Sequence, residues 1–416
     1  MENSPTPTPE ADDPLENFAR RSLRLFPAVL FAFALGLRLL LLTISGAIAG
    51  TEARNLSFFY DGLGYLYVSK TFPWAYITVP AFPVFYKPVV FTVWFPLYPF
   101  FIWLADFLIR DARISALAVA HVSAGLATIL FYRLAKTTTR RPATAAVLFC
   151  FFPPIWLLAG SMALVEPIYV LCFLASIFYY RAGKIRMSAA CAAAAILAQK
   201  SGFLLLPIVL IDELWANGLG RIRRLTPFLF SPVPAILLQA RLCAFYGDPR
   251  ATLDVMRALN NGESFQLPFQ AFLAGLLSRE QWFHGDFWLR KIGLASCASF
   301  YLGVFAAAWR RRSTLDRGLI AWLGAVLLFN MSLGGSSGYF PFPRYMLVAA
   351  PAALLLLMEL LPKGCVEWRG RWLALALFVP IAMAINVTEI AAQMELILRM
   401  WPRGYFQLLL GYFARS

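Results

Sequence analysis

The sequence predicts an all-α polytopic membrane protein that crosses the bilayer about eleven times. Three observations predict this fold class. Of the 416 residues, 60% are hydrophobic and only 14% are charged, which is more apolar surface than a soluble fold of this length can bury. Apolar runs near the length of a bilayer-spanning helix recur along the chain. Short basic clusters separate these runs, as expected for loops that stay on the cytoplasmic side.

The predicted spans are apolar runs of about 20 residues. One stretch is longer: residues 187–216 are apolar throughout, except for a break at Gln199-Lys200-Ser201-Gly202. About 30 residues exceed the reach of one tilted helix, so two short helices are expected there. The other spans are expected at about 25–48, 114–134, 143–160, 164–181, 226–246, 291–309, 317–333, 344–361 and 372–390.

The basic clusters fix the orientation. If all of them face the cytoplasm, residues 141–181 and 187–216 must each cross the membrane twice, which puts Ser161–Pro167 and Lys200 at outer turns. The N-terminus is then inside and the C-terminus outside. Residues 91–109, with two prolines, must lie on the membrane surface or re-enter it. The clusters are Arg20–Arg24, Arg133–Arg141, Arg181–Arg186, Arg221–Arg224, Arg310–Arg312 and Lys363–Arg371.

The same pattern divides the chain into segments. The Pro-rich, acidic beginning predicts a disordered cytoplasmic tail over residues 1–24. Two outer loops are long enough to suggest a functional role. In order after the tail, we expect a transmembrane core at 25–246 with its outer loop at 49–113, a second outer loop at 247–290, C-terminal transmembrane helices at 291–390 and an extracytoplasmic amphipathic tail at 391–416.

Charge and metal-ligating residues limit the function classes. The net charge is +15, but the basic residues sit in short runs between spans, so they indicate topology first and attraction to anionic lipid or a phosphate-bearing substrate second. Nucleic acid is not an expected partner, because no basic soluble domain exists. Six scattered cysteines without a CxxC pair and two histidines do not predict a metal site.

Two carboxylates at outer positions are candidate catalytic groups. Asp61 lies among aromatic residues, which suits a general base or a metal ligand, although an aspartate before a short helix is equally typical of an N-cap. Glu166 precedes Pro167 at the outer end of a span. Alternatively, Glu166 is a structural carboxylate in the first helical turn, where it interacts with the helix dipole.

Two cations are predicted on the same outer face. Lys200 interrupts the most apolar stretch, and Arg344 stands at an outer helix end, so each is either a topological anchor or a partner for an anion. His284, in the second long loop, is a candidate for acceptor binding against a structural alternative. Arg38 lies inside the first span, where an arginine needs a partner.

Together these groups suit sugar transfer from an isoprenoid phosphate. One carboxylate can accept the proton of an acceptor hydroxyl. The cations can stabilise the charge of the departing phosphate. Aromatic side chains can stack on sugar faces, and apolar helices can hold the lipid tail.

At this point the sequence resembles a known family. Over about residues 25–361 it is similar to the GT-C glycosyltransferases, most of all to the GPI mannosyltransferase II (PIG-V) type and its bacterial relatives. The ordered motifs that carry the resemblance are Tyr60-Asp61 with Tyr65, Phe95-Pro96-Leu97-Tyr98-Pro99, Val165-Glu166-Pro167, Ala198-Gln199-Lys200-Ser201-Gly202 and Pro343-Arg344-Tyr345.

The resemblance implies a membrane glycosyltransferase whose extracytoplasmic first loop carries juxtamembrane helices. It implies inverting transfer of a hexose, with mannose as the expected sugar, from a polyprenyl- or dolichyl-phosphate donor to a glycan, lipid or protein acceptor. Asp61 would be the general base, and Glu166 would be the second acidic residue of the catalytic site. The residues expected to bind the donor phosphate or substrate are Lys200, Arg344, Tyr345, Tyr65, Tyr98 and His284.

The sequence departs from the family at the first motif. Tyr60 stands where relatives often carry tryptophan, and no second carboxylate adjoins Asp61. No metal ligand is therefore assigned, and a divalent cation, Mg²⁺ or Mn²⁺, is the one cofactor that the resemblance allows. The expected location is a bacterial inner (plasma) membrane, or the ER membrane in a eukaryote.

Two other functions remain open. A transporter would show internal repeats and ionisable residues near the midplane of several helices, whereas here such residues gather at outer ends. A polymerase or ligase of lipid-linked glycans shares the substrate class and typically has a late outer loop rich in arginine and histidine. The loop 247–290 contains Arg250, Arg257, Arg279 and His284.

Overall fold

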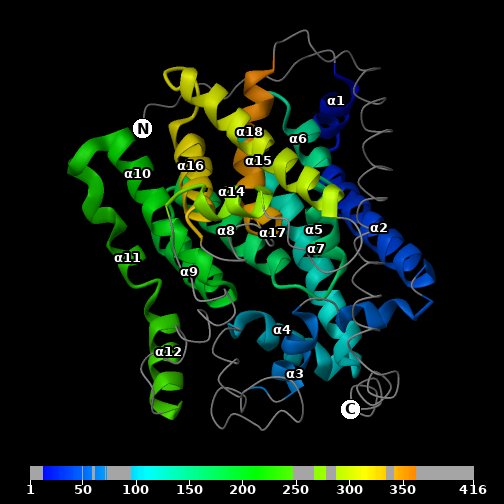
Figure 1. Ribbon diagram of the computed structural model, residues 1–416. Coiled ribbons are helices and arrows are strands. Elements are labelled where there is room, and N and C mark those ends of the chain that lie inside the picture. The colour runs from blue at the N-terminus through cyan, green and yellow to red at the C-terminus, as the bar shows by residue number, and fades with distance from the viewer. Residues whose placement is uncertain are drawn as a thin grey trace.

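The computed structural model describes residues 13–361, apart from 49, 59–60, 71, 73–94, 247–266, 278–286 and 334–341. Within these ranges the protein is a bundle of helices and connecting turns and contains no strand. Figure 1 shows long helices that run side by side, with short helices across one end of the bundle. The predicted all-α class is confirmed.

The first part of the bundle is built around α5 (Ala112–Thr138), which packs against both α2 (Leu25–Ile48) and α8 (Glu166–Arg181). One face of α5 carries fully buried small residues, Ala116, Ala120, Ala124 and Ala127, whose spacing of three or four keeps them on one side of the helix. Small side chains let neighbouring helices approach closely. Between α5 and α8 lies a broken segment, α6 (Pro142–Phe149) and α7 (Pro154–Ser161), bent by 60°.

The predicted break in residues 187–216 is present. Helix α9 (Ile185–Ala198) ends before a 3-10 turn, η4 (Lys200–Leu204), and α10 (Leu205–Asn217) returns. Gly202 lies so close to the end of α9 that an added Cβ would be 2.6 Å from the backbone of Ala195 and Ile196. A residue with a side chain would force this reversal open, so glycine is needed there.

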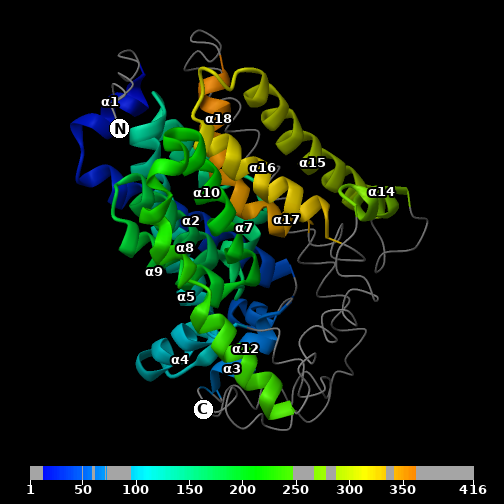
Figure 2. The same cartoon turned by 90° about the vertical axis from the view of Figure 1, so that its left-hand side faces the viewer.

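The second part of the bundle contains the remaining helices. Helix α16 packs against α10, α15 and α18, which joins the two parts (Figure 2). Their bounds are η5 (Gly218–Leu225), α11 (Thr226–Leu229), α12 (Val233–Tyr246), α14 (Gln270–Leu277), α15 (Phe287–Arg310), α16 (Arg317–Met331), α17 (Phe342–Tyr345), η7 (Met346–Ala349) and α18 (Ala350–Leu360).

The helix ends that were predicted to face the cytoplasm contact one another at one end of the bundle. Arg181 binds Asp316 at 2.7 Å, which joins the end of α8 to the start of α16. The backbone N–H of Arg140 donates to Glu359 (3.3 Å), and Arg311 donates to the Leu360 carbonyl (3.4 Å). The basic clusters at these positions therefore share one face, as the positive-inside prediction requires.

Among the described residues, fewer helices than the eleven predicted spans are long and apolar enough to cross a bilayer. Among the described residues, four helical runs are long and apolar enough to cross a bilayer, and the bent α6–α7 pair makes a fifth if it is one span. Several others, such as α9 and α16, have 14 and 15 residues. At 1.5 Å per residue these reach about 20 Å, less than a bilayer core of about 30 Å. The count of eleven thus remains a prediction.

Two segments of the first outer region are short helices. Helices α3 (Gly62–Lys70) and α4 (Leu97–Ile109) pack on each other and against α5, at the end of the bundle away from α1 (Figure 1). Helix α4 has 13 residues, too few to cross a bilayer, and its Phe107 and Leu108 are 62% and 88% exposed. This geometry fits a helix that lies in the membrane surface.

The N-terminal segment differs from its prediction. Residues 14–21, expected to belong to a disordered tail, form helix α1 (Pro14–Arg21). Asp13 caps the helix by accepting from the backbone N–H of Leu15 (2.9 Å). Glu16 then docks the helix by accepting from the N–H groups of Ala143 (3.1 Å) and Thr144 (2.9 Å) at the start of α6. The expectation for residues 362–416, including the tail 391–416, lies outside the described residues.

Candidate functional site

Three charged residues from distant parts of the chain meet in one cluster. The guanidinium of Arg344 donates from Nε (2.8 Å) and Nη2 (2.5 Å) to Oε1 of Glu166. The same Nη2 donates to Oδ2 of Asp61 at 3.1 Å. We call Asp61, Glu166 and Arg344 the outer triad. The sequence predicted all three on the outer face, and the structure brings them into direct contact.

Exposure within the outer triad is uneven. The side chain of Glu166 is 1% exposed, that of Arg344 is 15% exposed and that of Asp61 is 47% exposed. Oxygen Oε2 of Glu166 has no hydrogen-bond partner within the described part of the chain. Glu166 therefore binds Arg344 on the buried side of the cluster. Asp61 binds Arg344 on the exposed side, where a substrate can arrive.

Asp61 combines its two sequence-based interpretations. It stands at the N-cap position of α3, where its backbone carbonyl accepts from the N–H of Tyr65 (3.1 Å). Its carboxylate, however, binds Arg344. The helix start places this residue, and the carboxylate stays available for chemistry at the rim.

A glycine brings the two carboxylates together. Gly62 follows Asp61 directly, and a Cβ at Gly62 would overlap the backbone carbonyl oxygen of Ser57 and come within 3.3 Å of the Ala163 carbonyl oxygen. Ala163 is three residues before Glu166. The absence of a side chain at Gly62 thus lets the start of α3 pack on the turn that leads into α8. Sequence reasoning missed this role, although the glycine beside the aspartate was the available signal.

The backbone around Arg344 is anchored in the second part of the bundle. The carbonyl of Tyr345 accepts from Nδ2 of the buried Asn330 (3.5 Å) on α16. Phe342 is fully buried and packs against Phe272 of α14 with the two rings tilted, their centroids 5.4 Å apart. These contacts fix the short helix α17 that carries Arg344. Tyr345 thus has a backbone contact here, and its predicted contact with substrate stays a prediction.

Lys200 opens the 3-10 turn η4, at the break between α9 and α10. Helix α9 packs along α8, the helix that begins at Glu166. The predicted contact of Lys200 with the donor phosphate stays a prediction.

The other predicted substrate residues are placed differently. Tyr98 is fully buried and donates its hydroxyl to the Ala116 carbonyl (2.9 Å), so in this structure it cannot line an open site. Tyr65 is 5% exposed and packs edge-on against Tyr98, with centroids 5.2 Å apart. Both rings therefore lie in the packed interior where α3 and α4 cover the end of α5. His284 lies outside the described residues.

The outer triad does not fit a divalent metal ion as placed. Arg344 occupies the position between the two carboxylates that a cation would need. Over the described ranges, no group of three or more His, Cys, Asp or Glu side chains is arranged to hold a metal.

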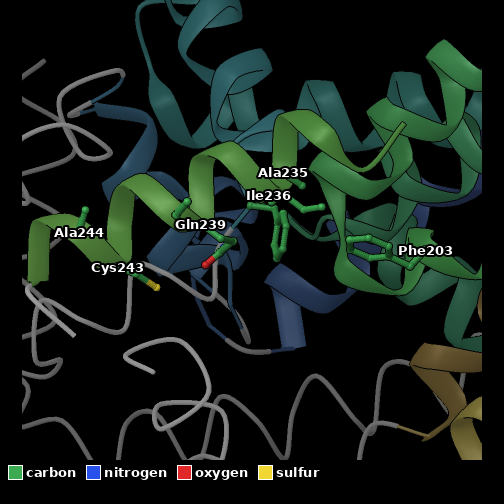
Figure 3. Close-up of a pocket in the computed structure, with 8 residues that line it drawn as sticks. Phe203, Ala235, Ile236, Gln239, Cys243 and Ala244 are labelled. Atoms are coloured by element: carbon green, nitrogen blue, oxygen red, sulfur yellow. The ribbon is translucent and has the colours of Figure 1, made fainter. Parts of the chain in front are cut away.

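An apolar groove opens beside the Lys200 turn. It has a volume of about 730 Å³ and lies between η4 and α12. Figure 3 shows Phe203 of η4 facing Ala235 and Ile236 of α12, with Gln239, Cys243 and Ala244 further along the same helix. The size is typical of a ligand pocket, and the lining suits a hydrocarbon chain. Phe95 and Ala240 complete the lining.

Comparisons by sequence find no match. No family model matches the chain, and no curated protein matches it. Comparison of structures does find similar proteins.

Two of the similar structures are crystal structures of ArnT from Cupriavidus metallidurans. The structure bound to undecaprenyl phosphate has a TM-score of 0.53 and 14% sequence identity, covering 90% of this chain and 77% of ArnT. The apo structure has a TM-score of 0.49 and 16% identity, covering 95% and 78%. At this identity the likeness with the first structure shows a shared fold.

Proposed function

We propose that the protein is a membrane glycosyltransferase that transfers a hexose from a polyprenyl-phosphate donor to an acceptor hydroxyl at the outer membrane face. The observation that supports this most is the outer triad: one arginine shared by a buried glutamate and a half-exposed aspartate. The fold shared with an ArnT structure bound to undecaprenyl phosphate supports the donor class. Mannose and the PIG-V-like specificity rest on the sequence resemblance.

In the proposed reaction Asp61 is the general base. It takes the proton of the acceptor hydroxyl while that oxygen attacks the anomeric carbon of the sugar. The bond from the anomeric carbon to the phosphate oxygen breaks, and the polyprenyl phosphate leaves as a monoester dianion. The acceptor attacks opposite the leaving group, so the configuration inverts. The proton ends on Asp61, which becomes neutral as the phosphate gains a negative charge.

The shared arginine couples these two charge changes. Before reaction, Arg344 is held by both carboxylates. Protonation of Asp61 weakens its hold on Arg344, at the moment when the leaving phosphate needs a cation. Glu166 keeps the guanidinium in place, since its contact is buried. Arg344 and Lys200 would then stabilise the phosphate, which is the electrostatic part of the catalysis.

The apolar groove supplies a place for the lipid tail. It begins at Phe203, three residues from Lys200, so a phosphate held at Lys200 has its hydrocarbon chain directed along α12. Ala240→Trp should fill the groove and raise the KM for a long-chain donor more than for a short-chain one. Leu237→Trp, on the same helix but 64% exposed, is the matched control and should change neither KM.

The test of the function is Asp61→Asn in purified protein supplied with a polyprenyl-phosphate hexose and candidate acceptors. The wild type should release polyprenyl phosphate, and the variant should turn over about 10²- to 10⁴-fold more slowly. Asp316→Asn, at the opposite end of the bundle, is the control and should retain activity. Wild-type turnover by the Asp61 variant would refute the role of the base, and a wild type that is inert with every such donor would refute the function.

A further inference from the structure

Helix α1 presents a surface that the proposed function does not use. Its outward side and the turn after it carry exposed apolar side chains: Phe18 is 42% exposed, Leu23 is 61% exposed and Leu25 is 56% exposed. Exposed arginines alternate with them, namely Arg20, Arg21 and Arg24. No acidic residue occurs between Phe18 and Leu25. The surface is therefore both apolar and positively charged.

The helix is held firmly on its inward side. Glu16 is 1% exposed, and its carboxylate accepts from the N–H groups of Ala143 and Thr144 and from the Thr144 hydroxyl (3.2 Å). Phe18 also packs edge-on against Phe26, which in turn packs against Tyr132 of α5 at 4.9 Å. Burial raises the pKa of Glu16, while its bonds to Thr144 and Ala143 lower it. A docked helix of this kind keeps one fixed side toward its surroundings.

The depth of this surface follows from the chain itself. Only Ser22, Leu23 and Arg24 separate α1 from α2, the most apolar of the long helices. The first residue of α2 marks where the chain enters the bilayer core, so α1 must lie within one turn of that boundary. Figure 1 shows α1 at the end of the bundle where α2 begins. Exposed side chains at this depth meet lipid head groups.

We propose that α1 and the turn Ser22–Arg24 form an in-plane anchor that binds anionic phospholipids of the inner leaflet. Arg21 and Arg24 would contact the phosphate groups, while Leu23 and Leu25 insert between the upper parts of the acyl chains. Interleaved arginines and large apolar residues are typical of helices that bind such surfaces. Each basic residue near an anionic leaflet adds favourable interaction that salt weakens.

The experiment places a spin label at Leu23→Cys in the full chain, in a background without the six native cysteines. The protein is put in nanodiscs of phosphatidylcholine alone or mixed with phosphatidylglycerol, and the label's accessibility to oxygen and to a polar nickel reagent is compared. We expect preference for oxygen in the mixed lipid. Arg21→Gln/Arg24→Gln should shift the ratio several-fold toward nickel, and Arg21→Lys/Arg24→Lys should keep it.

Two further variants separate the anchor from other effects. Arg221→Gln/Arg223→Gln removes the same charge from η5 at the same end and should leave the label unchanged. Glu16→Ala removes the clamp and should make the label more mobile. The proposal is overturned if the label stays in water in both lipid mixtures, or if Arg21→Gln/Arg24→Gln leaves its accessibility unchanged. If the surface bound an acidic protein instead of lipid, the label would stay in water in both lipid mixtures.

Discussion

Two groups of charged residues at opposite ends of α8 are built differently: the inner pairs Arg181–Asp316 and Arg224–Glu213, and the outer triad. At the inner end, every carboxylate oxygen of Asp316 and Glu213 accepts a hydrogen bond. Asp316 binds Arg181 through two parallel bonds of 2.7 and 3.0 Å. Glu213 accepts from Asn217 (2.9 Å), Tyr180 (3.1 Å) and Arg224 (2.8 Å). Each of these two arginines hydrogen-bonds to one carboxylate group.

At the outer end, two carboxylates share one arginine. Glu166 is left with a buried oxygen that accepts no hydrogen bond from any described residue, and Asp61 is half-exposed. A cluster whose charges are fully matched stabilises a fold and has nothing to offer a ligand. A cluster with unmatched groups costs stability, and such a cost is typical of functional sites. On this difference rests our expectation that the inner pairs are structural and that the outer triad takes part in the chemistry.

The largest expected effect comes from removing the shared cation. Arg344→Met leaves Glu166 buried and unpaired, which should cost about 3–5 kcal/mol of stability. It also removes a donor to the leaving phosphate, so turnover should fall about 10²- to 10³-fold. The measurements are thermal unfolding and release of polyprenyl phosphate. Arg344→Met/Glu166→Gln should recover much of the stability and none of the activity; recovery of both would show that the outer triad is only structural.

The next effect tests how closely the two carboxylates must approach. Gly62→Ala places a Cβ against the Ser57 carbonyl, so α3 must move away from the turn before Glu166. A misplacement of about 1 Å can lower turnover about 10²-fold. Gly36→Ala is the control, because a Cβ at Gly36 meets nothing within 4 Å. Equal activity of the two variants would contradict the close-approach role of Gly62.

The smallest effect is expected at the inner end. Arg181 and Asp316 have side chains that are 22% and 35% exposed, so Arg181→Gln should cost about 0.2–1 kcal/mol of stability. Turnover should not change, because the inner cluster takes no part in the reaction. Thermal unfolding and release of polyprenyl phosphate are again the two measurements. Loss of activity without loss of stability would remove the contrast between the two ends.

Sequence patterns predicted the architecture where the signal was local and repeated. Apolar runs and basic clusters located the helices, and Lys200 and Glu166 lie at helix starts after a break or turn, as expected. The charge pattern predicted that Asp61, Glu166 and Arg344 share one face, but the side of the membrane on which they lie stays a prediction. Their catalytic roles stay predictions.

Features that depend on distant packing were not visible in the sequence. The sharing of Arg344 by two carboxylates depends on angles between helices, which apolar periodicity does not encode. Tyr98 resembles a substrate residue in the sequence, yet it is buried because α4 folds over α5. Residues 14–21 looked like a polar tail, since the partner of Glu16 is the start of α6, more than a hundred residues later.

The most direct test is a structure of the protein with a polyprenyl phosphate bound. The account predicts the phosphate within hydrogen-bonding distance of Arg344 and Lys200, the hydrocarbon chain along α12 beside Phe203, and Glu166 still bound to Arg344. It also predicts that the Asp61 carboxylate has moved away from Arg344 toward the acceptor side. A phosphate bound elsewhere, with the outer triad unchanged, would contradict the central claim that these three residues form the transfer site.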